Sequence, residues 1–179
     1  MSRFNLRKLC ATGMGAALFV VLSLCLQVPV FENYYLCLGY IAMAIFCYFF
    51  GPINGMFVGS IGVVLYCLLI SGLRGMPGWF VGNLIIGLMV GLTCKLTKRM
   101  TNQMVRQIII IFVVIISTGI GILGAKSIIE SLLYAQPFVL RVAKNSFAFI
   151  ADIIVLSISF PICLAIQPVV YKIFPELRN

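Results

Sequence analysis

The sequence predicts an all-α integral membrane protein, built as a bundle of six transmembrane helices. Hydrophobic residues make up 63% of the 179 residues, and the mean hydropathy is +1.16. Only 9% of the residues are charged, whereas soluble domains carry about 25%. The longest polar stretch is the short run KLTKRMTNQ. Because no stretch has room for a soluble catalytic domain, we expect a single membrane domain over residues 1–179.

Six apolar stretches, taken in order, give the expected spans. A helix needs about 20 residues to cross the bilayer core, and fewer where protein surrounds it. The first stretch follows a basic start, and the short second stretch is joined to the third by Gly51 and Pro52 alone. The segments SGLRGMPG and KLTKRMTNQ bound the fourth, and AKSIIESLLYAQPFVLRVAKN separates the fifth from the sixth. The expected spans are 9–28, 37–50, 53–71, 79–97, 105–125 and 145–171.

The distribution of lysine and arginine orients the bundle, because cytoplasmic segments of membrane proteins carry an excess of both. With the N-terminus in the cytoplasm, most of the 13 basic residues fall inside, namely Arg3, Arg7, Lys8, Lys95, Lys98, Arg99, Arg106, Lys172 and Arg178. The others fall outside, namely Arg74, Lys126, Arg141 and Lys144. We therefore expect both termini in the cytoplasm and recognition at the longer outer segments.

Composition disfavours several function classes. A net charge of +9 would suit a nucleic-acid-binding protein, but here the basic residues flank apolar spans as topology signals do. The chain has no histidine, and its seven cysteines form no CxxC pair, so we expect neither a metal site nor a disulfide framework. No acid–base or nucleophile pair at useful spacing favours an intramembrane enzyme acting on lipids. We expect no catalytic residues.

Glycines recur at intervals of four residues in the third and fourth spans. Glycine costs about 1 kcal/mol relative to alanine in a helix, but in lipid small residues let two helix backbones approach closely. We therefore expect tight helix contacts along these faces. The glycines are Gly51, Gly55 and Gly59 in the third span, and Gly78, Gly82, Gly87 and Gly91 in the fourth.

Small residues also line the cytoplasmic end of the first span. They are spaced four apart, as Ala11 and Gly15, Thr12 and Ala16, and Gly13 and Ala17. Such a face can pack inside the bundle or receive the helices of a partner. The spacing alone slightly favours packing inside the bundle.

Asp152 is the most informative single residue, because a carboxylate within a span costs at least about 2.5 kcal/mol and usually faces a cavity or a partner. It follows Asn145 by two helical turns, about 10 Å along a helix, so the two side chains share a face. Lys144 lies on roughly that face. Asp152 therefore belongs to a ligand site or forms a structural ion pair with Lys144 or Lys126, and one role does not exclude the other.

Other polar and aromatic residues fall near the outer ends of the spans. Lys126 and Glu130 have the i, i+4 spacing of an ion pair, and Asn83 lies one turn below Trp79. Interfacial aromatic residues usually anchor a helix in the membrane. Their concentration beside polar groups also suggests a small-molecule pocket. The residues concerned are Tyr34, Tyr35, Trp79 and Tyr134 with Glu32, Asn33, Arg74 and Asn83.

The chain resembles a known family, the substrate-binding (S) components of energy-coupling factor (ECF) transporters, which take up vitamins in bacteria and archaea. The matching stretches are LCATGMGAALFVVLSL after the basic start, LGYIAMAIFCYFFGPINGMFVGSIGVVLYCLL, and GMPGWFVGNLIIGLMVGL. The FGPxxGxxVG element from Phe50 to Gly59 is the most specific of these, and the six-span layout with both ends inside also fits.

The resemblance implies a binding subunit without enzymatic activity, in a prokaryotic cell membrane. It implies a vitamin pocket in the outer half of the bundle, and a small-residue motif on the first helix that docks against a transmembrane coupling subunit. Two ATPase subunits would use ATP, since this chain has no GxxxxGK[ST] phosphate loop. The docking motif falls on Gly13 and Ala17 with Ala16 beside them, and a glycine stands in place of the first alanine.

The expected ligand is a small aromatic heterocycle such as hydroxymethylpyrimidine or a pyridoxine-like compound, with riboflavin as an alternative. Its ring would stack on Trp79 or Phe149, while Asp152 and Asn145 bind its polar edge. A membrane assembly or structural protein, with Asp152 in an ion pair, is the rival from another class. The expected substrate-binding residues are Tyr35, Trp79, Asn83, Lys126, Glu130, Asn145, Phe149 and Asp152.

Overall fold

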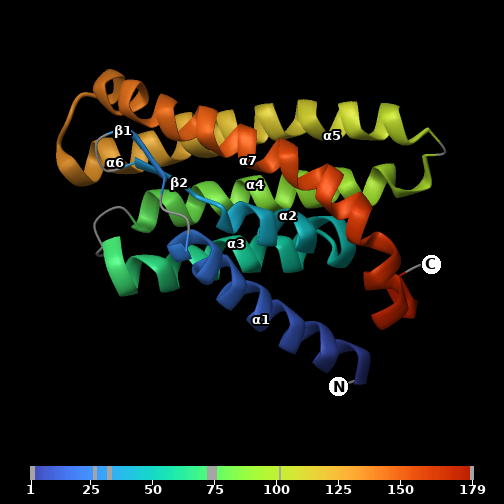
Figure 1. Cartoon of the computed structure of the whole chain (residues 1–179). Coiled ribbons are helices and arrows are strands. Elements are labelled where there is room, and N and C mark those ends of the chain that lie inside the picture. Colours follow the sequence, from blue (N-terminus) through green and yellow to red (C-terminus); the bar gives the residue numbers. More distant parts are fainter. Residues whose placement is uncertain (1–2, 26–27, 32–33, 72–75, 101, 178–179) are drawn as a thin grey trace.

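The computed structural model of the chain describes residues 3–25, 28–31, 34–71, 76–100 and 102–177. For residues 3–5, 28–31, 34–35 and 71 it describes the backbone only. It is a bundle of long helices with a short hairpin (Figure 1). The helices are α1 (Arg3–Cys25), α2 (Gly39–Phe50), α3 (Pro52–Tyr66), α4 (Met76–Leu96), α5 (Gln103–Thr118), α6 (Ser127–Tyr134) and α7 (Phe138–Ile173). The π-helical segments η1 (Cys67–Ser71) and η3 (Gly119–Lys126) continue α3 and α5, and the 3-10 turns are η2 (Thr97–Arg99) and η4 (Pro175–Leu177).

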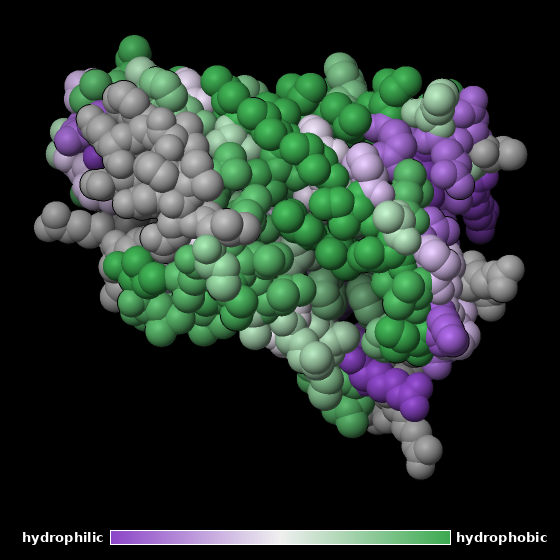
Figure 2. All heavy atoms as spheres, in the orientation of Figure 1, coloured by the Kyte–Doolittle hydropathy of each residue, from purple (hydrophilic) through white to green (hydrophobic). Residues whose placement is uncertain are grey.

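Five of the helical stretches in the described residues are long and apolar enough to cross a membrane. They are Leu6–Cys25, Pro52–Ile70, Met76–Arg99, Gln103–Tyr134 and Phe138–Ile173. Hydrophobic side chains cover much of the surface in Figure 2, and hydrophilic residues gather toward the end that carries the termini. This is the surface of a multi-pass membrane protein, in which lipid covers the apolar faces of the helices.

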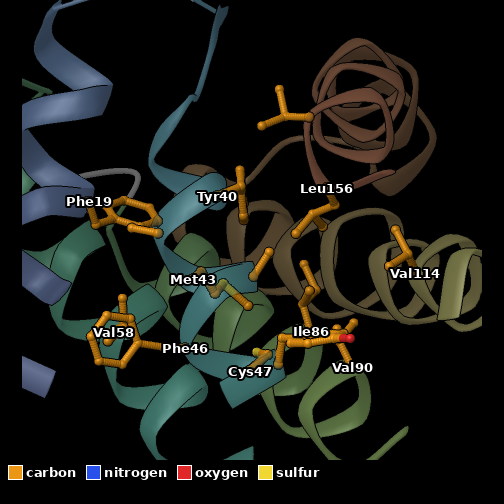
Figure 3. Packing of buried hydrophobic residues seen from close by; sticks show 14 of the residues in the cluster. Phe19, Tyr40, Met43, Phe46, Cys47, Val58, Ile86, Val90, Val114 and Leu156 are labelled. Carbon is orange, nitrogen blue, oxygen red and sulfur yellow. The ribbon is translucent and has the colours of Figure 1, made fainter. Parts of the chain in front are cut away.

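The second expected span, 37–50, corresponds to α2, which has only 12 residues yet occupies the centre of the bundle. It contacts α1, α3, α4 and α7, and nine of its residues are buried. Because protein surrounds α2, its length is not set by the thickness of the bilayer core. In Figure 3 its side chains Tyr40, Met43, Phe46 and Cys47 lie among Phe19, Val58, Ile86, Val90 and Leu156 of the neighbouring helices.

The structure differs from the expected element bounds in three places. The first helix ends at Cys25 rather than 28, because β1 (Val28–Phe31) pairs antiparallel with β2 (Tyr34–Leu36), with Val28 opposite Leu36. The fold is therefore helical with one hairpin rather than purely α. The fifth expected span continues through η3 and α6 to Tyr134, and the last helix begins at Phe138. Most of the expected outer segment 125–145 is thus helical.

Glycines let α3 pack closely between α2 and α4. A Cβ atom added at Gly87 would lie 2.6 Å from the Met56 Cα atom, and one at Gly55 would lie 2.9 Å from the Cys47 Cα atom. At Gly91 it would press on the Pro52 Cα atom. Gly51 differs from the expected seam, because it is the turn residue between α2 and α3, with φ of 88° and open space around its Cβ position.

The connections define two ends of the bundle (Figure 1). The hairpin end carries β1 and β2, the end of η1, the start of α4 and the α6–α7 connection. The terminal end carries both termini, the Gly51 turn and the α4–α5 connection. Helices α2, α4 and α7 each begin at the hairpin end, so residues in their first turns lie near the last turns of the α5–η3–α6 rod.

Candidate functional site

A buried group of polar and aromatic side chains lies toward the hairpin end, between α2, α4, the η3–α6 segment and α7. Most of its members expose 7% of their surface or less, and Tyr40, Asn83, Ser127 and Asn145 expose none. So many buried polar groups at membrane depth are costly unless each one is satisfied. This polar cluster comprises Tyr40, Trp79, Asn83, Lys126, Ser127, Glu130, Arg141, Asn145 and Asp152.

One half of the polar cluster joins α2 to α4 and α3. The Trp79 Nε1 atom donates a hydrogen bond to the Tyr40 hydroxyl group at 2.9 Å. The Tyr40 hydroxyl group donates to the Asn83 Oδ1 atom at 2.8 Å, and the Asn83 Nδ2 atom donates to the Gly59 carbonyl oxygen at 3.1 Å. This chain of donors holds the Trp79 indole in place beside the buried start of α2.

The other half joins η3 and α6 to α7 around Glu130. The Asn145 Nδ2 atom donates to the Ser127 Oγ atom and to the Glu130 Oε2 atom, each at 3.0 Å. The Lys126 Nζ atom lies 3.9 Å from Glu130 Oε1, so the expected i, i+4 pair is present. Arg141 lies 3.9 Å from Glu130 Oε2. Two cations and an amide therefore compensate the charge of this carboxylate.

The π-helical turns of η3 shape this half of the cluster. A π turn shifts the backbone pairing by one residue and is frequent at functional sites. Here the Ser127 hydroxyl group donates to the carbonyl oxygen of Ile122, five residues earlier, at 3.1 Å. The small residue Gly78 brings α4 against the same turns, because its Cβ position lies 3.1 Å from the Lys126 carbonyl oxygen. Trp79 is thereby placed beside the charged half.

Asp152 connects the two halves. Its side chain is 5% exposed, and its carboxyl group interacts with the hydroxyl group of Tyr40 and with the positive charge of Lys126. Asn145, Phe149 and Asp152 follow one another at i, i+4 and i+7 on α7, which puts them on one face of that helix. A carboxylate offers about four acceptor positions, and among the described residues Asp152 interacts with Tyr40 and Lys126, which leaves acceptor positions there for an entering donor.

The structure brings most of the expected site residues together. Trp79, Asn83, Lys126, Glu130, Asn145 and Asp152 all belong to the polar cluster. Phe149 is partly buried on the same face of α7, with its ring 3.7 Å from the Cβ position of Gly119. Tyr35 lies in β2, and its side chain falls outside the described part, as do the side chains of Glu32, Asn33, Tyr34 and Arg74.

Three members of the polar cluster were not predicted from the sequence. Tyr40 stands in an apolar run, and only the contact between α2 and α4 reveals its role. Ser127 acts through the π turn, which has no clear sequence signal. The sequence indicates Arg141 only as a topology signal, yet its guanidinium group packs 4.1 Å from the centroid of the Tyr134 ring and faces Glu130.

The small residues of α1 divide into two faces. Thr12, Gly15 and Ala16 are buried, and a Cβ atom at Gly15 would lie 2.5 Å from the Phe46 ring. Gly13 and Ala17 are exposed, and nothing lies within 4 Å of the Gly13 Cβ position. The packing expected inside the bundle therefore applies to the first face, while Gly13 and Ala17 lie on an outward surface with Met14.

Comparisons with known proteins agree with this architecture. A family model described as "ECF-type riboflavin transporter, S component" matches residues 3–167. A UPF0397 protein of Streptococcus thermophilus is 42% identical over 65 residues, 36% of each chain. UPF0397 protein YdcD of Lactococcus lactis is 36% identical over 91 residues, 49% of this chain and 48% of the relative. A UPF0397 protein of Streptococcus agalactiae is 35% identical over 101 residues, 49% of this chain and 56% of the relative. The matches thus span about a third to just over half the length of these relatives.

Proposed function

The chain belongs to the ECF-type riboflavin transporter S component family, and on this premise we propose that it is the substrate-binding subunit of an ECF importer for a vitamin or vitamin precursor. It binds the ligand in the polar cluster and performs no chemistry on it. Its partners are a transmembrane coupling subunit and two ATPase subunits. The protein lies in the plasma membrane of a prokaryote, as six spans with both termini in the cytoplasm, so that the hairpin end faces outward.

The observation that carries the proposal is the pairing of charges within the polar cluster. Glu130 is neutralised by Lys126 and Arg141 and accepts a hydrogen bond from Asn145. Asp152, by contrast, interacts with the charge of Lys126 and with the Tyr40 hydroxyl group. A buried carboxylate with free acceptor positions is costly in a membrane, where such groups usually mark a substrate pathway or ligand site. A ligand with N–H or O–H donors would satisfy Asp152.

The charge balance also bears on the ligand class. Two cations, Lys126 and Arg141, face two carboxylates, Glu130 and Asp152. Among the described residues of the polar cluster, a ligand with several negative charges, such as folate, finds no excess of cations. A neutral aromatic heterocycle with hydroxyl or amine groups fits better, with Trp79 and Phe149 as its stacking surfaces. Hydroxymethylpyrimidine and pyridoxine-like compounds have this chemistry.

Riboflavin is the second candidate, and the match to the family model favours it. Its ribityl hydroxyl groups are donors for Asp152, and its ring system needs a longer aromatic surface than a pyrimidine does. The rival function, a membrane assembly protein in which Asp152 only stabilises the bundle, requires no ligand at all.

Titration calorimetry on the purified chain in detergent tests the proposal. The ligands are riboflavin, hydroxymethylpyrimidine and pyridoxine, each measured against the wild type and the Asp152→Asn variant. Submicromolar binding of one compound, weakened in the variant, supports an S component with a site at Asp152. If none of these or other vitamins binds the folded wild type, the assembly function takes its place.

A further inference from the structure

A second group of polar side chains lies away from the polar cluster, toward the terminal end of the bundle. Arg106 is in the first turn of α5, close to the α4–α5 connection. Its guanidinium carbon Cζ lies 4.4 Å from the centroid of the Tyr48 ring on α2. The Tyr48 hydroxyl group in turn contacts Gln167 Oε1 on α7 at 3.5 Å. Tyr48, Arg106, Gln107 and Gln167 are called the Arg106 group below.

Arg106 turns into the protein. An arginine near the end of a spanning helix commonly extends its head toward water. Here the Nε atom is buried and has no hydrogen-bond partner among the described residues. The neighbouring Gln107 has the same property, because both atoms of its amide group are buried without a partner in the part of the chain that the structure describes. Three buried polar atoms on two adjacent residues thus lack hydrogen-bond partners among the described residues.

The spacing along α5 shows that both residues flank its buried face. Ile110 and Val114 are fully buried, and they follow Arg106 and Gln107 at intervals of three, four, seven and eight residues, which keep one side of a helix. The two side chains therefore belong to the interior side of α5, where this helix packs against α4 and α7.

No described carboxylate compensates the charge of Arg106. Glu130 and Asp152 belong to the polar cluster at the other end, and Glu176 pairs with Arg7 at 3.8 Å. Arg106 is partly buried, and a charge drawn away from water without a counter-ion is disfavoured. The contact with the Tyr48 ring compensates only part of this cost, since such a contact stabilises by about 0.5–2 kcal/mol. Among the residues that the structure describes, the guanidinium group of Arg106 therefore has no anionic partner.

We propose that the Arg106 group binds a phosphate group, supplied by the headgroup of an anionic phospholipid or by free phosphate. The guanidinium fork suits two phosphate oxygens at once, and its geometry matches phosphate better than a lysine would. The Gln107 Nε2 atom supplies a further donor. The position within the first turn of a spanning helix puts this group near the headgroup level of the bilayer, where lipid phosphates are abundant.

Native mass spectrometry on the delipidated full chain tests the proposal, with phosphatidylglycerol titrated as the probe and phosphatidylcholine as the reference lipid. The wild type should retain phosphatidylglycerol in preference to phosphatidylcholine. Arg106→Gln should weaken this retention about tenfold, the effect of losing one charge-assisted hydrogen bond or more. Arg99→Gln is the matched control, because it removes the same charge from an exposed residue of η2 at the same end, and should retain the lipid.

A second arm adds inorganic phosphate before the lipid. Displacement of phosphatidylglycerol by millimolar phosphate identifies free phosphate as an alternative source, whereas undiminished lipid retention assigns the site to the headgroup. If the wild type retains the two lipids equally and phosphate displaces neither of them, the proposal is overturned without any variant. Equal retention by Arg106→Gln and wild type also overturns it. Should Arg106→Gln misfold, Arg106→Lys and Gln107→Leu provide the comparison, and each should retain less lipid than Arg99→Gln.

Discussion

The hydroxyl group of Tyr40 donates a hydrogen bond of 2.8 Å to the Asn83 Oδ1 atom, and this bond ties the short central helix α2 to α4. The same hydroxyl group accepts a hydrogen bond from the Trp79 indole and interacts with the carboxyl group of Asp152. One side chain that is fully buried thus touches three expected site residues. The Tyr40 ring packs in the helix core while its hydroxyl group belongs to the polar cluster, so this residue links the two.

Tyr40→Phe should lower both stability and ligand affinity. The substitution keeps the ring but leaves the Trp79 Nε1 and Asn83 Oδ1 atoms without their partner, which costs about 1–3 kcal/mol for each unsatisfied buried group. The thermal unfolding midpoint in detergent and the dissociation constant by calorimetry measure the two effects. Tyr171→Phe is the control, because the Tyr171 ring packs against the Phe49 ring. This variant should change neither the unfolding midpoint nor the dissociation constant. If Tyr40→Phe unfolds at the wild-type temperature, the hydrogen-bond chain does not stabilise the fold.

Asp152→Asn should weaken ligand binding by more than about tenfold, equivalent to 1.4 kcal/mol or more, while the protein still folds. The amide keeps the shape of the carboxyl group but loses the charge that attracts N–H and O–H donors. Titration calorimetry measures the change. Glu176→Gln makes the same chemical change on an exposed carboxylate at the terminal end, and its affinity should equal that of the wild type. An unchanged affinity in Asp152→Asn would remove Asp152 from the site.

Gly91→Ala should destabilise the bundle, and Gly13→Ala should not. The added methyl group at Gly91 would press on the backbone of Pro52, which cannot move aside without shifting α3. Overpacking of this kind costs about 1–3 kcal/mol. At Gly13 the Cβ position is open, so only the gain in helix propensity of about 1 kcal/mol remains. Thermal unfolding of the two variants in one detergent gives the comparison, and equal midpoints would argue against close α3–α4 packing as the role of Gly91.

Gly13→Leu and Ala17→Leu should prevent co-purification with the coupling subunit and leave ligand binding intact. Both positions lie on the exposed face of α1, where a bulky side chain would keep the backbone of a docking helix away. Pull-down of the coexpressed coupling subunit, with calorimetry on the same preparations, separates the two properties. Ala165→Leu is the control, since it enlarges an exposed alanine of α7 instead. A complex that still assembles with both α1 variants would place the docking surface elsewhere.

Much of the helical layout follows from the sequence, because lipid exposure demands long apolar stretches. Each expected span corresponds to a helix, including the short α2. The hairpin between α1 and α2 was not predicted, since VPVF and YYL are short and carry no turn motif. The extension of α5 through η3 and α6 was missed for a related reason. The stretch 125–145 was expected as an outer segment between two spans, although its Lys126 and Glu130 form the expected i, i+4 pair inside the protein.

The polar cluster was predicted where spacing along one helix determines proximity. Asp152 follows Asn145 by seven positions and Glu130 follows Lys126 by four, so each pair shares a face wherever its segment is helical. Contacts between helices were beyond this argument. Tyr40 lies 43 residues from Asn83 along the chain, and nothing in its apolar neighbourhood indicates that partner. Arg106 served only to orient the chain, although its buried Nε atom carries the phosphate proposal.

Mass spectrometry of the small molecules that co-purify with the chain tests the central claim most directly, namely that the polar cluster holds a vitamin-like ligand. The chain is purified from its native expression host without added ligand, as the wild type, Asp152→Asn and Glu176→Gln. We predict that the wild type and Glu176→Gln carry one aromatic heterocycle in near-equimolar amount, and that Asp152→Asn has lost it. The same compound retained in full by Asp152→Asn would contradict the account.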